Sequence, residues 1–337
     1  MQIIDCDMRD RQAPAGSKII ALGNFDGLHR GHQALIREAV LQSKKEGALS
    51  ACLLFKHHTT ALLSDHSQCY LTSVEDKIAL LDQFGIDVVF LKEFDQKFRS
   101  LTKEDFIENV LKNQLHASCV IVGNDFRFGV KAQGTVWDLK KAQENHRLNV
   151  SVVDDVLYQG KRISSTRIRE AVLAGRVEEA GDMLGRPFQL SGRVVHGSHR
   201  GQSKLNFPTA NLELHFPYVL PTNGVYLTEV FWEDEHAYGM TDIGTNPTFT
   251  DQSVLKIETH IFDFHGDLYG KNMRLNFLRF ERRDIKFRCA EELSAQMKED
   301  QRILMTWIRE EKERNGCTFV NDVRPKSQEE ISDMLPY

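Results

Sequence analysis

The sequence predicts an α/β unit with a parallel sheet, followed by a mostly β unit of the six-stranded barrel type that ends in a helix. Two observations predict this fold class. Pro14 is the one proline before position 187, whereas the other seven prolines of the 337-residue chain lie at 187 or beyond. Near Gly185 and Pro187 the hydrophobic pattern changes from apolar runs that alternate with helical patterns to longer β-rich runs. Strand–helix alternation is typical of a parallel sheet with helices on both faces.

Short apolar runs predict the strands of the first unit, at 19–22, 51–55, 88–91 and 120–122. A helix is expected over 32–45, after the glycine-rich sequence that follows the first strand. Ligands of such sheets bind beyond the carboxyl ends of the strands. The segments directly after these strands are therefore the expected positions of a site.

Two further helices are expected in the first unit. Thr72 and Glu75 have the spacing of a capping box, and Gly85 suits the end of the helix that they begin. After Thr102, apolar residues recur at helical spacing, at Phe106, Val110 and Leu111.

In the second unit, β-branched and aromatic residues predict strands at 225–231 and 255–262. A third strand has one buried face, because apolar residues alternate with polar ones at Met273, Leu275 and Phe277. Glycine and proline turns separate these runs, so a small antiparallel barrel fits.

An amphipathic helix follows the barrel, with apolar residues near one face at Leu293, Met297, Leu304 and Ile308. The sequence beyond Asn315 is charged and irregular. The expected domains are therefore 1–185, 186–315 and a tail at 316–337.

Composition narrows the class of protein. Apolar residues make up 41% and charged residues 27% of the chain, and the formal net charge is −5. This balance is ordinary for a globular protein and argues against nucleic acid or an anionic membrane as a partner. No run approaches the roughly 18 apolar residues of a membrane span. The sequence leaves the oligomeric state open.

The cysteines and the N-terminal sequence predict a cytoplasmic location. Six cysteines are scattered without a C-x-x-C pair, which favours reduced thiols over disulfides or a cysteine-based zinc site. Residues 1–18 are polar and lack the apolar region of a signal peptide.

The first candidate site is the segment 23–32, which directly follows a predicted strand. Its glycines at 23, 27 and 31 allow the backbone to approach a ligand closely. His32 lies where a helix is expected to begin, and a helix N-terminus attracts phosphate. His29 and His32 could both donate to one phosphate group. A tight turn with two solvated histidines remains the alternative, and a zinc site is a weaker one.

The whole string, Gly23-Asn24-Phe25-Asp26-Gly27-Leu28-His29-Arg30-Gly31-His32, is more specific than its histidines. It resembles the H-x-G-H signature of the nucleotidyltransferases, in the form that bacterial FAD synthetases carry. Two later segments match the same family in order: 123–129, with Asn124, Asp125 and Arg127, and 163–169, with Ser164, Ser165, Thr166 and Arg167.

The resemblance implies a Rossmann-like nucleotidyltransferase domain. It makes His29 and His32 catalytic, and it assigns nucleotide binding to three sets of residues: Gly23, Asn24, Phe25, Asp26 and Gly27; Asn124, Asp125 and Arg127; and Ser164, Ser165, Thr166 and Arg167. One departure stands out, because the family's F-x-P-x-P stretch reads Phe55-Lys56-His57-His58-Thr59 here, without either proline. The change leaves open whether this site is fully active.

The second candidate site joins an oxygen-rich pair to a strand glutamate. Thr209 and Asn211 alternate along an extended segment and so point the same way. Their hydroxyl and amide oxygens suit Mg²⁺ that bridges ATP phosphates. Glu258 lies in an apolar strand and could accept a proton from an attacking hydroxyl. A local turn and an outward-facing glutamate are the simpler alternatives.

The second half resembles riboflavin kinase. The matching segments, in family order, are G-R-V-V-H-G at 192–197, F-P-T-A-N at 207–211, G-V-Y at 224–226, I-G-T-N-P-T-F at 243–249, E-T-H at 258–260 and D-L-Y-G at 267–270. The resemblance implies that Thr209 and Asn211 bind Mg²⁺ and ATP, that the loop from Gly197 to Lys204 wraps the nucleotide, and that Glu258 is the catalytic base.

Together the two halves have the order of the bacterial bifunctional riboflavin kinase/FAD synthetases. That family phosphorylates riboflavin to FMN and adenylylates FMN to FAD, with ATP in both steps. The expected partners are therefore small molecules: riboflavin, FMN, FAD and ATP. The alternative is a kinase alone, with a weakened adenylyltransferase half, because the F-x-P-x-P stretch is absent.

Overall fold

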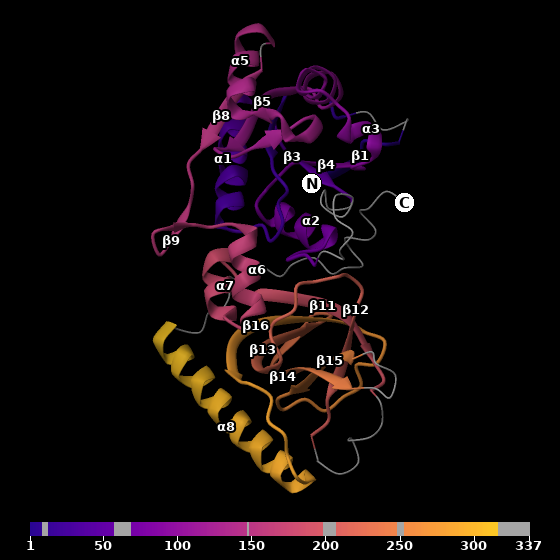
Figure 1. Ribbon diagram of the computed structural model, residues 1–337, viewed down its shortest axis with the longest axis vertical. Helices are drawn as coiled ribbons and strands as arrows, with labels where there is room; N and C mark the ends of the chain where they lie inside the picture. Colours follow the sequence, from indigo (N-terminus) through magenta and orange to yellow (C-terminus); the bar gives the residue numbers. More distant parts are fainter. Residues whose placement is uncertain (9–12, 57–68, 147, 198–206, 248–252, 316–337) are drawn as a thin grey trace. The chain divides into compact units, whose positions relative to one another are not determined.

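The computed structural model describes residues 1–8, 13–56, 69–146, 148–197, 207–247 and 253–315, in two compact units (Figure 1). The first unit runs to Ser164, and the second begins at Ser165 and also includes Cys69–Leu71. The units divide at this point because α7 (Val177–Leu184) packs against the barrel strands β11 and β16. The boundary expected at 185, between the domains that carry the two activities, stays a prediction.

A six-stranded parallel sheet forms the centre of the first unit. Its strands, in order across the sheet, are β1 (Gln2–Asp5), β4 (Val88–Lys92), β3 (Leu49–Phe55), β2 (Lys18–Leu22), β5 (Ala117–Gly123) and β8 (Asn149–Val153). The four strands expected from the sequence are confirmed, and the two edge strands are additional. One apolar cluster lies on each face of the sheet, as a doubly covered sheet requires.

Helices and short turns connect these strands. They are α1 (Arg30–Glu46), α2 (Val74–Gln83), α3 (Gln96–Arg99), α4 (Lys103–Asp105), a π-helix (Phe106–Gln114), a 3₁₀ turn (Val130–Ala132) and α5 (Val136–His146). Two small ribbons pair β6 (Arg127–Phe128) with β7 (Gly134–Thr135), and β9 (Leu157–Tyr158) with β10 (Lys161–Arg162).

Two sequence expectations need correction in this unit. The capping box of α2 is formed by Ser73 and Asp76, not by Thr72 and Glu75. Thr72 is buried instead and contacts the loop after β2, which leaves the next residue to cap the helix. The first long helix begins at Arg30 rather than at His32, because the side chain of His29 is the N-cap.

In its described residues, the second unit is a closed barrel with three helices. Its strands, in order around the barrel, are β11 (Phe188–Val195), β12 (Ala210–Leu214), β15 (Ser253–Ile261), β14 (Glu235–Pro247), β13 (Gly224–Trp232) and β16 (Asn272–Arg282), with every pair antiparallel. Its helices are α6 (Ser165–Leu173), α7 and α8 (Ala290–Asn315). The predicted barrel and terminal helix are therefore confirmed.

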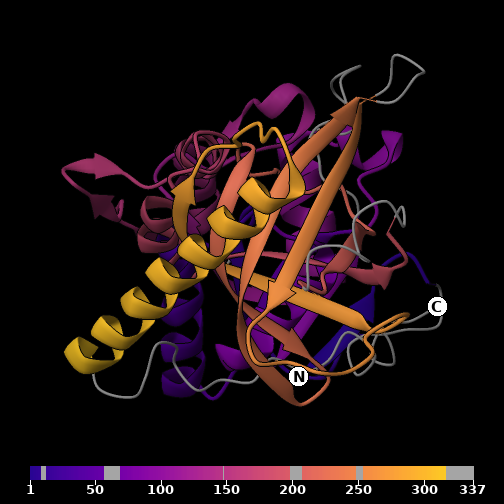
Figure 2. The same ribbon diagram turned by 90° about the horizontal axis from the view of Figure 1, so that it is seen from below.

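Helix α8 lies across the outside of the barrel (Figures 1 and 2). Leu304 and Ile308 pack on Val225, Leu227 and Met240, which belong to strands β13 and β14. The Arg282 guanidinium also binds the buried carboxylate of Asp300 on α8, with an Nη2–Oδ2 distance of 2.7 Å. Apolar packing and this ion pair together hold α8 against the end of β16. In the part of the chain that the structure describes, no helix has the length and hydropathy to cross a membrane.

Three threonine hydroxyls form a hydrogen-bonded chain inside the barrel. Thr241 Oγ1 lies 2.8 Å from Thr228 Oγ1 and 2.9 Å from Thr259 Oγ1, and all three residues are fully buried. Thr228 Oγ1 also donates to the carbonyl of Gly239. Buried hydroxyls need hydrogen-bond partners, and the Thr241 hydroxyl is a partner for both of the others.

We expect Thr241→Val to destabilise the barrel by about 1–3 kcal/mol, because the substitution leaves two buried hydroxyls without their shared partner. Urea unfolding followed by the fluorescence of the second unit would measure the change. Thr306→Val, at an exposed position on α8, is the matched control. Equal stability of the two variants would contradict a stabilising role for the chain.

Candidate active sites

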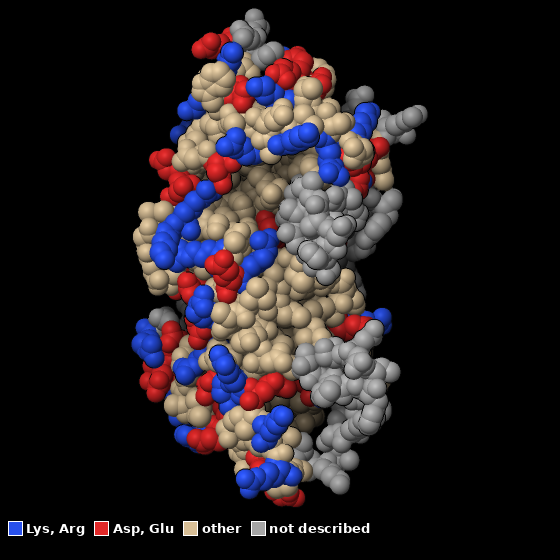
Figure 3. Space-filling view, viewed as in Figure 1, with Lys and Arg blue, Asp and Glu red and all other residues tan. Residues whose placement is uncertain are grey.

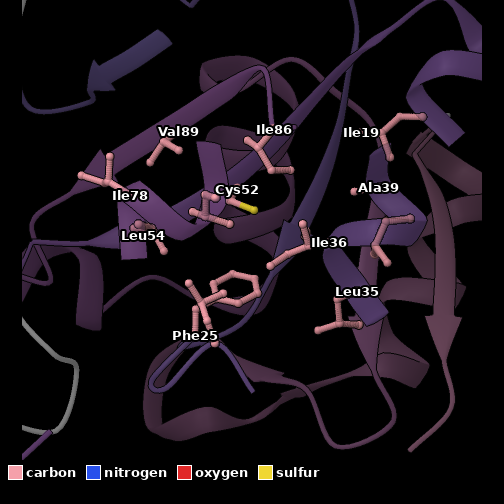
Figure 4. Close-up of a cluster of buried hydrophobic side chains, with 14 of the residues drawn as sticks. Ile19, Phe25, Leu35, Ile36, Ala39, Cys52, Leu54, Ile78, Ile86 and Val89 are labelled. Atoms are coloured by element: carbon pink, nitrogen blue, oxygen red, sulfur yellow. The ribbon is translucent and has the colours of Figure 1, made fainter. Parts of the chain in front are cut away.

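The loop after β2 forms a tight left-handed turn. Phe25, Gly27 and Leu28 have φ angles of 51°, 83° and 40°. Left-handed backbone is unfavourable for phenylalanine and leucine and persists where the surroundings hold it. Both side chains are fully buried, and Figure 4 shows the Phe25 ring directed into the apolar cluster with Ile36 and Cys52. Phe25 therefore anchors the turn from the core.

Asp26 and Gly27 attach the turn to the start of α2. The buried Asp26 carboxylate accepts from the Thr72 backbone N–H at 3.3 Å, and the Gly27 N–H donates to Thr72 Oγ1 at 2.9 Å. Asp26, which was expected to bind nucleotide, is thus engaged in positioning the loop. Asn24 is exposed.

The two histidines of the motif stack at the start of α1. Their ring centroids are 3.7 Å apart, and His29 Nδ1 accepts from the His32 backbone N–H at 3.4 Å. When the His29 ring is neutral, Nδ1 accepts this hydrogen bond and the ring proton is on Nε2. Gly31 is required beside this pair, since a Cβ there would lie 3.1 Å from both Cε1 and Nδ1 of His29.

Positive charges surround His32. Burial lowers the pKa of His32 well below its ordinary value, and the charges of His29, Lys77 and Arg162 lower it further. Lys77, which is buried one turn into α2, and Arg162 on β10 were not identified from the sequence. The sequence offered a signal for Arg162, which directly precedes the 163–169 motif, but none for Lys77.

Asp125 meets Arg162 beyond the carboxyl ends of β5 and β8. Arg162 Nη2 lies 2.7 Å from Asp125 Oδ2, and its Nε lies 3.2 Å from Asp155 Oδ1. The hydrogen bond from Arg162 holds the pKa of Asp125 below its ordinary value, and the charge of His29 adds to this effect. Asp125 is therefore ionised and holds Arg162 near the histidines. Asn124 and Arg127 are exposed nearby in the same segment.

The third motif lies at the division between the two units. Ser164 ends the first unit, whereas Ser165, Thr166 and Arg167 begin α6 in the second. Arg167 Nη2 lies 3.6 Å from the carboxylate of Glu179 on α7. The expected phosphate contact of Arg167 stays a prediction.

Lys56, in the altered F-x-P-x-P stretch, follows β3 and forms ion pairs with the end of β1. Its Nζ lies 2.8 Å from Asp5 and 3.3 Å from Asp7. The remaining residues of the stretch, His57, His58 and Thr59, lie outside the described residues.

In the second unit, strand register brings Asn211 and Glu258 together. Asn211 on β12 pairs with Glu258 on β15, which in turn pairs with Asp242 on β14. Directly paired residues of antiparallel strands project from the same face. The three side chains therefore form a row on the outer face of the barrel, because the alternate residues Ile257 and Thr259 are buried inside.

Lys256 and Asp242 set the charge around Glu258. Lys256 Nζ lies 2.7 Å from Glu258 Oε1. Burial raises the pKa of Asp242 to about 6, with further contributions from the negative charges of Asp284 and Glu258. Asp242 and Lys256 were not identified from the sequence, although the alternation of polar side chains at 256, 258 and 260 was a usable signal for Lys256.

Thr209 and Asn211, the expected magnesium ligands, lie just before and near the start of β12. Asn211 is 8% exposed and packs against Gly197, where a Cβ would lie 2.6 Å from its Nδ2 atom. His260 Nδ1 lies 2.9 Å from the carbonyl oxygen of Pro208 and so steadies the turn before Thr209. These oxygen donors are of the kind that Mg²⁺ prefers. Lys204 lies outside the described residues.

The described residues hold no group of three or more His, Cys, Asp or Glu side chains suited to a metal ion. Basic and acidic side chains are interspersed over the face seen in Figure 3.

Comparison with known proteins matches each half to a family. Residues 11–167 match the FAD synthetase family, and residues 184–308 match the riboflavin kinase family. A bifunctional riboflavin kinase/FMN adenylyltransferase from Listeria monocytogenes is 37% identical over 287 residues, which is 85% of this chain and 90% of the relative. The chain belongs to the bifunctional riboflavin kinase/FMN adenylyltransferase family.

Further relatives agree over nearly the same length. The Escherichia coli K12 protein of the same description is 35% identical over 292 residues, 86% of this chain and 92% of that protein. A solved chain from Streptococcus pneumoniae, described as a macrolide-efflux protein, has a TM-score of 0.83 and 31% identity and covers 91% of this chain and all of its own.

Both activities of the family follow for this chain. It phosphorylates riboflavin to FMN and adenylylates FMN to FAD, with ATP as the second substrate of each reaction. The alternative of a kinase alone is not favoured, because the FAD synthetase match extends across the altered stretch at Phe55.

We expect Gly31→Ala to lower the rate of FAD formation by about tenfold to a hundredfold, because the new Cβ displaces the His29 ring. FMN formation should be unchanged. Separate assays of the two products would measure both rates. Gly181→Ala is the control, since its Cβ would meet nothing nearer than 3.5 Å; equal FAD formation by both variants would contradict the steric argument.

The depressed pKa of His32 predicts acid sensitivity of the first unit. Below about pH 6.5 the unfolded chain binds a proton at His32 that the folded chain does not, so the free energy of unfolding falls as the pH drops. Above that pH both states are neutral and the effect vanishes. We expect His32→Gln to lose less stability than the wild type between pH 7.5 and 5.5 in chemical denaturation. Parallel losses would show that His32 is not responsible.

Proposed function

We propose that adenylyl transfer takes place at the stacked histidines of the first unit. The FMN phosphate oxygen attacks the α-phosphorus of ATP, a new P–O bond forms, and pyrophosphate leaves. His29, whose Nδ1 accepts from the His32 backbone N–H, donates from Nε2 to the phosphate oxygens, and the positive end of the α1 dipole adds to the attraction. Arg162, held by Asp125, contributes positive charge beside His32. No protein nucleophile is needed.

The remaining nucleotide contacts of this centre come from the residues that match the family motifs. We assign them to the backbone of Gly23 and Gly27, to the side chains of Asn24, Asn124 and Arg127, and to the segment from Ser164 to Arg167. Phe25 and Asp26 act through the loop, since one is buried in the core and the other binds the backbone of Thr72.

Phosphoryl transfer is proposed to take place on the outer face of the barrel. Glu258 accepts the proton of the ribityl 5′-hydroxyl. The hydroxyl oxygen bonds to the γ-phosphorus of ATP, and the bond from that phosphorus to the β-phosphate oxygen breaks, which releases ADP. Thr209 and Asn211 would hold Mg²⁺, which neutralises phosphate charge when it is bound. The pairing of Asn211 with Glu258 supports this assignment, because it sets a metal ligand directly beside the base.

One observation carries the proposal of two independent centres: the histidine pair belongs to the first unit, and the Asn211–Glu258 pair belongs to the second. A cytoplasmic location is part of the same proposal. It rests on the free thiols of Cys6, Cys52, Cys69, Cys119 and Cys289.

A crossed pair of variants tests the proposal. We expect His29→Ala to lower FAD formation from FMN by about 10²–10³-fold and to leave FMN formation intact. Glu258→Gln should lower FMN formation by about 10²–10⁴-fold and leave FAD formation intact. Product separation after incubation with ATP, Mg²⁺ and either riboflavin or FMN measures both rates.

His265→Ala and Glu235→Gln, at exposed positions of the barrel unit, are the matched controls. Loss of both activities in either test variant, with intact folding by circular dichroism, would overturn the separation of the two centres. Full kinase activity of Glu258→Gln would remove the base from the proposal.

A further inference from the structure

The row that contains Glu258 continues across the barrel. Asp242 pairs with Glu258 on one side and with Val225 on the other, and Val225 pairs with Arg282. Val225 is buried under α8, with Leu304 and Ile308 in the same cluster. The polar part of the row is therefore three strands wide, from Asn211 through Glu258 to Asp242.

Asp242 is a half-buried acceptor without a donor among the described residues. No described side chain or N–H group forms a hydrogen bond or ion pair with its carboxylate, although Lys256, Arg282, Asp284 and Glu258 lie near enough to act on its charge. The Lys256 ammonium is held by Glu258 at 2.7 Å. The Asp242 carboxylate is only partly withdrawn from water, and a ligand hydroxyl would offset the cost of that partial burial.

The spacing of the row matches a polyol. Paired residues on neighbouring strands have their Cβ atoms about 4.5–5.5 Å apart. A chain of carbons that carries a hydroxyl on each, and that begins with the reacting hydroxyl at Glu258, reaches the adjacent strand after a few carbons. Glu258 has two direct partners, and because one of them is Asn211, the proposed metal ligand, the carboxylate that the chain can meet belongs to the other, Asp242.

We propose that the Asp242 carboxylate accepts a hydrogen bond from a secondary hydroxyl of the ribityl chain and thereby makes the kinase selective for a polyol side chain. The proposal rests on the assignment of Glu258 as the base. Asp242 takes no part in the transfer itself. It is a specificity-determining residue, which aligns the chain so that the terminal hydroxyl lies at Glu258.

The test compares riboflavin with its 2′-, 3′- and 4′-deoxy analogues as kinase substrates at pH 8, where Asp242 is ionised. We expect the wild type to prefer riboflavin over one analogue by about tenfold to a hundredfold in kcat/KM, the range of a hydrogen bond to a charged group. In Asp242→Ala, kcat/KM should fall by the same factor with riboflavin and should not fall with that analogue. Asp242→Asn, which keeps an acceptor oxygen, should restore part of the preference.

Asp284→Ala is the matched control, because it removes a neighbouring, exposed carboxylate whose residue is not paired with Glu258. It should keep the wild-type preference, and FAD formation from FMN should be normal in every variant. Equal losses by Asp242→Ala with riboflavin and all three analogues would overturn the proposal. Glu258→Gln is assayed in parallel with each substrate, because it reports on the chemical step. It therefore distinguishes an error in the role of Asp242 from an error in the assignment of Glu258 as the base.

Discussion

Strand register on the outer face of the barrel is the constraint on which the kinase centre depends. Asn211, Glu258 and Asp242 are far apart in the sequence, and they become neighbours because β12, β15 and β14 pair at those positions. A shift of one residue in either pairing would turn one side chain into the barrel. The buried threonines on the opposite face resist such a shift, because Thr241 and Thr259 are also direct partners. The threonine hydrogen bonds inside the barrel and the row of site residues on its outer face therefore depend on the same strand register.

The first unit solves a different problem, which is to hold a strained turn at the end of a strand. The Phe25 ring in the core and the two hydrogen bonds to Thr72 hold the loop from opposite directions. The stacked histidines then follow at the start of α1. Residues of one motif can therefore differ in role. The buried Asp26 shapes the loop, whereas Asn24 in the same motif is exposed.

Much of this architecture could be predicted from the sequence, because apolar runs report buried strands directly. The central strands β2, β3, β4 and β5 were predicted, whereas the edge strand β8, which is only half buried, was not. The motifs identified His29 and Glu258, but they could not identify Lys77 or Asp242. Those two reach their sites through helix packing and strand pairing, and neither relation is visible in a local pattern.

The threonine chain inside the barrel has a direction. Thr228 gives its hydrogen to the Gly239 carbonyl, so Thr241 must give its own to Thr228, and Thr259 must give its own to Thr241. Each hydroxyl has a single hydrogen to donate. The orientation of all three is therefore set by one backbone carbonyl, and no hydroxyl can rotate alone without breaking the sequence of donors. Reversing the chain would require all three hydroxyls to rotate together, so the three O–H dipoles keep one common orientation inside the barrel.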